Sequence, residues 1–186
     1  MENLGIACIT LILIVIPTLI CADSDYRVAT VISAADLDAA KASADPDRVS
    51  DQPLSHVESA EGRLGIGVVH RPVIEAGGPI NAIQHHKQSE VYRVMAGSGT
   101  LVTGATMTES SALDPDGRVV QNLVGPSDIG VIVEIENRQR IGEGDVVIIP
   151  AGVAHGFSEI TEAITYMVVR VDPERLVALE PEPANQ

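Results

Sequence analysis

The sequence predicts an all-β fold, a barrel or sandwich of short antiparallel strands that follows a short helix. From Leu64 onward, short runs of β-branched residues alternate with Gly, Pro, Asn and Asp, which is the pattern of such folds. Residues 26–62, before that point, are Ala-rich or polar. A length of 186 residues fits one domain with a buried core.

The part of the chain after residue 63 contains eight candidate strands, a number that suits a jelly roll. Gly97-Ser98-Gly99 separates two of them and is expected to form a tight hairpin. Residues 107–117 are expected to form an exposed loop, and residues 173–179 one or two helical turns. The candidate strands are 64–74, 82–86, 90–96, 100–104, 118–124, 129–136, 145–149 and 163–171.

The N-terminal third shows two further features. Ser33 is expected to cap a short helix that runs to about Ala44, with Asp36 in its first turn and Pro46 ending it. Residues 45–62 are polar and turn-rich, and we interpret them as an arm that lies across the barrel or across a dimer partner. The predicted organisation is a signal peptide at 1–22, an N-terminal arm at 23–62, a barrel at 63–172 and a C-terminal tail at 173–186.

The signal peptide is predicted from an apolar run between Leu4 and Cys21, which ends at the polar residues after Ala22. It implies a secreted or periplasmic protein. An uncleaved membrane anchor is the alternative, because no Lys or Arg precedes the run and its length is at the lower limit for a span. Both cysteines, Cys8 and Cys21, lie here, so the mature chain is expected to have neither a disulfide nor a thiolate ligand.

The charge of the chain argues against two classes of partner. Twelve basic and 26 acidic residues give a formal net charge of −14, which repels nucleic acid phosphates and anionic membranes. Aromatic residues make up 2% of the chain and Trp is absent, so platforms for base stacking are scarce. Nucleic acid is therefore not an expected partner.

Two segments contain candidate metal ligands. The first is QHHKQSEVYRVMAG, residues 84–97, and the second is GDVVIIPAGVAHGFSE, residues 144–159. Alternate residues of a strand face the inside of a barrel, so ligands must come from positions i and i+2 and from neighbouring strands. Imidazole and carboxylate groups together suit first-row metal ions and can leave coordination positions open for a substrate.

At these residues the sequence resembles the cupin superfamily, in particular its small single-domain, type-2-like members. Glu90 and Gly97 are six residues apart, as in the first cupin motif, and Gly144, Pro150, Gly152 and His155 match the second. The resemblance covers residues 64–171 and implies a cupin jelly-roll β-barrel with one divalent metal ion, which would be Fe, Mn, Ni, Zn or Cu. The candidate metal ligands that it implies are His86, Glu90, His155, Gln84 and His85.

The first motif departs from the family pattern, because the two alternating histidines are replaced by Gln84, His85 and His86 in succession. If His86 faces the interior, Gln84 takes the place of the first histidine. If His85 does, Ile83 takes that place and one ligand is lost. We favour the register with His86 inside, because it keeps a polar donor in the barrel and places Ile83 in the outer apolar layer.

The resemblance implies a metal-dependent enzyme for a small molecule, of the dioxygenase, isomerase, decarboxylase or lyase type. A non-catalytic ligand-binding cupin and a structural, oligomeric cupin are the alternatives, and a homodimer formed through the N-terminal segment is a further implication. Tyr92 shares the parity of Glu90, and packing is its expected role. Arg93 and Arg170 are expected to be solvated strand residues rather than contacts to an anionic substrate.

Overall fold

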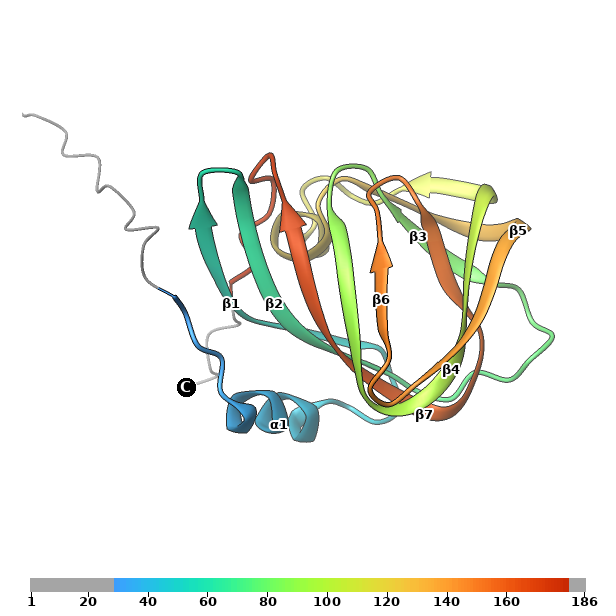
Figure 1. Cartoon of the computed structure of the whole chain (residues 1–186). Helices are drawn as coiled ribbons and strands as arrows, with labels where there is room; N and C mark the ends of the chain where they lie inside the picture. Colours follow the sequence, from blue (N-terminus) through green and yellow to red (C-terminus); the bar gives the residue numbers. More distant parts are fainter. Residues whose placement is uncertain (1–28, 181–186) are drawn as a thin grey trace, which may run out of the picture.

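The computed structural model describes residues 29–180, and the predicted signal peptide lies outside that range. Within it, no helix is both long enough and apolar enough to cross a membrane. Figure 1 shows a barrel of strands with one helix beneath it. The elements are α1 (Ala34–Ser43), β1 (Ser50–Ser59), β2 (Gly62–Arg71), β3 (Asn81–His85), β4 (Ser89–Ala112), η1 (Val120–Val124), β5 (Ser127–Gly142), β6 (Val146–Ile149) and β7 (Ala154–Asp172).

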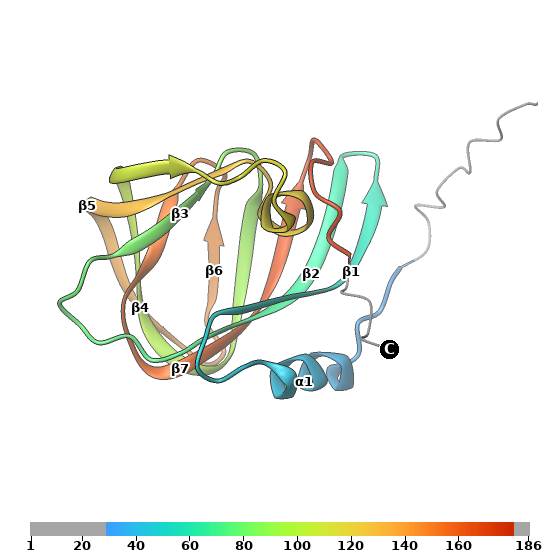
Figure 2. The same ribbon diagram turned by 180° about the vertical axis from the view of Figure 1, so that it is seen from behind.

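Helix α1 confirms the capping prediction. The Ser33 side chain accepts a hydrogen bond from the backbone N–H of Asp36, at 3.2 Å, and the Asp36 carboxylate accepts from the backbone N–H of Ser33, at 2.9 Å. This reciprocal pair satisfies two of the N–H groups that a helix leaves free at its start. The helix lies under the β1 and β2 end of the barrel in both views (Figures 1 and 2).

The strands confirm the all-β prediction and form a closed sheet. Their order is β1-β2-β7-β3-β5-β4-β6, and β4 also pairs with β7, which closes the ring. The long strand β4 pairs with β6 through residues 90–93 and with β5 through residues 98–112. The core lies inside this ring and consists of Val69, Tyr92, Val94, Leu101, Ile141, Ile149, Phe157, Ile160, Ile164, Tyr166 and Val168.

The expected hairpin at residues 97–99 is wrong, because β4 continues through these residues as one strand. Gly97 instead lies at an irregularity in the pairing of β4 with β7 and has a φ of 76°. A Cβ atom at this position would lie 2.1 Å from the carbonyl oxygen of Ala163. The glycine therefore permits a bend and a close approach of two strands. Part of the loop expected at 107–117 is also strand, since β4 extends to Ala112.

Two other segments differ from the sequence-based expectation. Residues 118–124 were predicted as a strand, but Val120–Val124 form the single helical turn η1. Residues 50–59, expected in a polar arm, form β1, which pairs with β2 in an antiparallel manner. Their side chains alternate too weakly in hydrophobicity for a strand to be predicted, and the pairing with β2 determines the structure.

The segment after β7 forms no helix, contrary to the prediction for residues 173–179. Residues 173–180, here called the C-terminal strap, run along η1 instead (Figure 2). Ala178 N–H donates to the carbonyl of Gln121, and Leu179 N–H donates to the carbonyl of Asn122, both at 3.0 Å. The side chains of Val177 and Leu179 are buried. The strap thus fixes η1 against the barrel.

Glu58 links the β1–β2 hairpin to the strap, because its carboxylate accepts hydrogen bonds from Arg63, at 2.6 Å, and Arg175, at 3.0 Å. Burial raises the pKa of Glu58, but the hydrogen bonds and charges of Arg63 and Arg175 outweigh this effect and hold the pKa below its usual value. A lowered folded-state pKa adds stability above the unfolded-state value, and this stability is lost as the pH falls. Glu58→Gln is therefore expected to lower the free energy of unfolding by roughly 1 kcal/mol near neutral pH.

The same comparison at a pH below the usual pKa of glutamate should show a smaller difference between wild type and Glu58→Gln, because the wild-type carboxylate takes up a proton as the pH falls. Urea denaturation at the two pH values measures both effects. Glu61→Gln, at an exposed position of the same hairpin, is the control. A Glu58→Gln effect that does not change with pH would contradict this account.

Candidate metal centre

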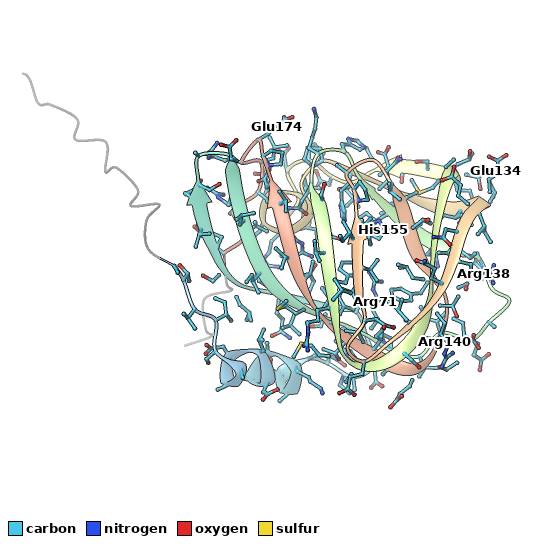
Figure 3. The ribbon with its side chains drawn as sticks, in the orientation of Figure 1. Arg71, Glu134, Arg138, Arg140, His155 and Glu174 are labelled. Carbon is cyan, nitrogen blue, oxygen red and sulfur yellow. The ribbon has the colours of Figure 1, made fainter. Side chains whose placement is uncertain are left out.

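Three buried side chains from three strands converge inside the barrel. His85 is the last residue of β3, Glu90 is the second residue of β4, and His155 is the second residue of β7. They meet because β3 and β4 both pair with β7, with Ile83 opposite His155 and Glu90 opposite Arg170. One potential ligand atom from each lies within 4.8 Å of the other two. His155 lies inside the ring of strands in Figure 3.

The structure corrects the preferred register of the first motif, because His85 and not His86 faces the interior. His86 is exposed, and its Nε2 atom lies 3.2 Å from the Asp128 carboxylate. The Gln84 side chain also points away from the cluster and donates to the carbonyl of Gly152, at 2.7 Å. Gly152 N–H in turn donates to the carbonyl of His85, so the turn before β7 holds β3 in this register. Ile83 lines the interior cavity.

The hydrogen bonds of the two buried histidines determine which ring nitrogen carries the proton. His85 Nδ1 lies 3.0 Å from Ser127 Oγ, and this hydroxyl donates its one proton to the carbonyl of Val124 or Gly125. Ser127 Oγ therefore accepts a hydrogen bond from the protonated Nδ1 of His85. His155 Nδ1 donates likewise to the carbonyl of Val153, at 3.0 Å. Both neutral imidazoles consequently turn the lone pair of Nε2 toward the cluster.

Glu90 lies at the centre of the cluster. Its Oε2 atom is 3.4 Å from His85 Nε2 and 3.5 Å from His155 Nε2. Burial raises the pKa of Glu90, but the charge of Arg170, whose Nε atom lies 3.0 Å from Oε1, is among the effects that hold the pKa well below its usual range. Glu90 is therefore ionised near neutral pH, and a carboxylate oxygen faces the two imidazole lone pairs.

Arg170 and Tyr92 hold the Glu90 carboxylate in position. Arg170 Nε donates to Glu90 Oε1, at 3.0 Å, and its two Nη atoms donate to Asp51, at 3.0 and 2.6 Å. The Tyr92 hydroxyl donates to Glu90 Oε2, at 2.7 Å, and its ring stacks on Tyr166 with centroids 4.2 Å apart. Burial and the charge of Glu90 raise the pKa of Tyr92 well above its usual value, so Tyr92 remains a protonated donor.

These contacts revise the expectation for Arg170 and add a second role for Tyr92. Arg170 is 3% exposed and paired with two carboxylates, so it is not a solvated strand residue as expected. Arg93 is exposed, as expected. Tyr92 packs in the core as expected, and it also contributes the hydroxyl group to the cluster. Ser127, Asp51 and Arg71 have no place in either motif and were missed by sequence reasoning.

The cluster borders a cavity of about 360 Å³ inside the barrel. A second cavity of about 470 Å³ lies next to it and shares Arg71, Ile83 and His155 as walls. Side chains that flank or belong to η1 close one side of the first cavity, including Val119, Leu123 and Val124. The volume suits a small organic molecule rather than a polymer.

The donor set fits a metal ion. Two imidazole nitrogens and one carboxylate oxygen, all buried and turned toward one point, would be stabilised by a cation between them, because their lone pairs otherwise repel one another. Nitrogen and oxygen donors of this kind bind divalent first-row transition metals, and three protein ligands leave positions open. The further bonds at Ser127, Val153 and Arg170 supply the orientation that metal ligands require.

The comparisons with known proteins give structural similarities only. No protein-family model matches the sequence, and no curated protein matches it. Among solved structures, BH2720 from Bacillus halodurans is 13% identical with a TM-score of 0.45, and the match covers 83% of this chain and 94% of that one. The DMSP lyase DddQ from Ruegeria pomeroyi is 19% identical with a TM-score of 0.37, covering 68% and 53%. The Schizosaccharomyces pombe Cnp3 cupin domain is 13% identical with a TM-score of 0.41, covering 70% and 66%.

The barrel and its interior define the class of the protein. Both segments that carry the cupin resemblance lie on adjoining strands, and His85, Glu90 and His155 from them meet at one buried point. The chain folds as a closed antiparallel β-barrel whose interior holds a candidate His–Glu–His metal site.

Proposed function

We propose that this protein binds one divalent transition metal ion through His85, Glu90 and His155 and acts on a small molecule in the adjoining cavity. The observation that carries the proposal is the convergence of two imidazole lone pairs on an ionised, buried carboxylate. An arrangement of this kind is electrostatically unfavourable unless a metal ion or added protons neutralise it.

When bound, the metal ion would supply Lewis-acid chemistry toward an oxygen atom of the substrate. The other groups of the site have roles that follow from their contacts. Arg170 holds one oxygen of Glu90 and leaves the other directed at the histidines. Tyr92 donates to that second oxygen and limits its orientation. The proposal covers dioxygenase, isomerase, decarboxylase and lyase reactions, because these contacts are compatible with each type.

A non-catalytic ligand-binding role is the second candidate, and one observation favours it. Ile83 lines the cavity at the position where the cupin motif has a first histidine, so the chain offers three protein ligands at this point instead of four. Fewer ligands hold a metal ion more weakly. Stoichiometric metal without turnover of any tested small substrate would support this role, and so would ligand binding in a metal-free protein.

The metal content of the purified protein tests the proposal. We expect about one transition metal ion per chain after reconstitution, and loss of most of it in His85→Ala and His155→Ala. His86→Ala is a matched control, because it removes the neighbouring imidazole, which is exposed and outside the cluster. Elemental analysis beside protein quantification measures all four proteins. No metal in the wild type, or equal loss in His86→Ala, would refute the proposal.

Export and dimerisation complete the proposal. We propose that residues 1–22 direct export and are removed, with an uncleaved membrane anchor as the alternative, and that the mature chain forms a homodimer. The apolar run that ends before Asp23 supports export. N-terminal sequencing of the exported protein distinguishes the two fates of the segment, and sedimentation measures the oligomeric state.

A further inference from the structure

Arg71 lies in the interior of the barrel, beside the candidate metal centre. It is the last residue of β2 and has the same parity as Val69, which belongs to the core inside the ring of strands. Figure 3 shows Arg71 and His155 within the ring, whereas Glu134, Arg138 and Arg140 lie toward its outer margin. Arg71 lines both cavities together with His155. Its guanidinium therefore borders the space in which a substrate of the metal centre would lie.

Other protein groups use only part of the hydrogen-bonding capacity of the Arg71 guanidinium. Its Nε atom donates to the Tyr166 hydroxyl, at 3.0 Å, and its Cζ atom lies 5.6 Å from the centre of the Phe157 ring. Within residues 29–180, Arg71 forms no ion pair, and its two Nη atoms have no hydrogen-bond acceptor. A guanidinium has five N–H donors, so four of them remain available. Arg170, in the same cavity, uses its donors on two carboxylates.

The charge of Arg71 lies in a cavity of an acidic chain. Three arginines, Arg71, Arg118 and Arg170, and two carboxylates, Asp51 and Glu90, line the cavity beside the metal centre. The chain as a whole carries a formal charge of −14. In a low-dielectric cavity, the charge of Arg71, which pairs with no carboxylate of residues 29–180, attracts an anion even within an acidic protein. A divalent metal ion would strengthen this preference.

We propose that Arg71 binds the carboxylate of a small organic acid and thereby sets the substrate class of the site. The role of the bound acid as a substrate rests on the proposed function, but the binding of its carboxylate to Arg71 does not. The planar fork formed by the two Nη atoms matches the two oxygens of a carboxylate. Tyr166, Val69 and Ile83 provide apolar wall for the hydrocarbon part of such a molecule. A single guanidinium without an acidic partner matches a single negative charge better than a phosphate dianion.

Calorimetric titration of the metal-free protein in the presence of a chelator tests the inference apart from the metal centre. The probes are propionate, its neutral isostere propionamide, and inorganic phosphate. We expect propionate to bind the wild type, and Arg71→Gln to bind it about 10- to 100-fold more weakly, as loss of a charged hydrogen-bonding group does. Propionamide should bind the wild type at least about tenfold more weakly than propionate. Arg93→Gln removes the same charge from an exposed position and should bind as the wild type does.

Several outcomes would overturn the inference: no propionate binding to the wild type, equal binding to Arg71→Gln, equal loss in Arg93→Gln, or tighter binding of phosphate than of propionate. If Arg71→Gln does not fold, as judged by circular dichroism, Arg71→Lys provides the test. It keeps the charge but loses the fork, and it should weaken propionate binding by at least about threefold. Metal content is measured on the same proteins. If the wild type takes up no metal on reconstitution but binds propionate through Arg71, the proposed function is refuted and the inference about Arg71 stands.

Discussion

Arg170→Met is expected to lower the free energy of unfolding by about 3–5 kcal/mol, because it leaves a buried carboxylate without its cationic partner. Arg170 and Glu90 are 3% and 2% exposed, and the ion pair between them has an N–O distance of 3.0 Å. Methionine fills a similar volume, so the loss reflects charge more than a cavity. Urea denaturation in the presence of a chelator measures the effect, since a bound metal ion would itself neutralise Glu90.

Two further variants make this prediction specific. Arg93→Met removes an arginine from an exposed position of β4 and should change stability by no more than about 0.5 kcal/mol. Asp51→Asn should cost less than Arg170→Met, because the Asp51 side chain is 21% exposed and Arg170 then still pairs with Glu90. An Arg170→Met loss below about 1 kcal/mol would mean that Glu90 takes up a proton at little cost or reaches solvent.

Leu179→Ala is expected to destabilise the protein by about 2–5 kcal/mol, as truncation of a buried leucine does. Leu179 is 1% exposed and packs over Gly65 of β2, where an added Cβ atom would lie 2.5 Å from Leu179 Cδ1. The strap also bonds to the backbone of η1, whose residues close one side of the cavity. Loss of the Leu179 side chain should therefore loosen the cavity wall as well as lower the stability.

Leu176→Ala is the matched control, because Leu176 belongs to the same strap but is 39% exposed. It should change stability by about 0.5 kcal/mol or less. Thermal or urea denaturation compares the two variants, and hydrogen exchange at Leu123 and Val124 reports on η1. Equal effects of the two substitutions, or undiminished exchange protection at η1 in Leu179→Ala, would contradict the role assigned to the strap.

Local patterns in the sequence predicted the helix and the general fold. Ser33 and Asp36 specify a helix start by themselves, because a capping box involves four consecutive residues only. The Glu90 to Gly97 and Gly144 to His155 spacings indicated which strands would face each other, and the resemblance to cupins rests on them. The structure brings Glu90 and His155 to one buried point.

Features determined by distant contacts could not be predicted in this way. The strand period shows that His85 and His86 face opposite sides, but it does not show which one faces inward. That choice depends on the hydrogen bond from Gly152 N–H to the carbonyl of His85. Residues 118–124 have the composition of a strand, yet they bond to the strap 57 residues further along the chain, at Gln121 and Ala178. Arg71 likewise has a role only because β2 ends beside His155.

The position of β7 in the sheet has a consequence for how this site can be inherited. β7 is the last strand of the described chain, yet it is the neighbour of β2, β3 and β4, and it supplies both His155 and Arg170. The groups around Glu90 therefore extend from Asp51 to Arg170. No single hairpin contains them. Recombination that moves one hairpin from this gene to another cannot transfer the pocket. The pocket can pass between proteins only with the whole barrel.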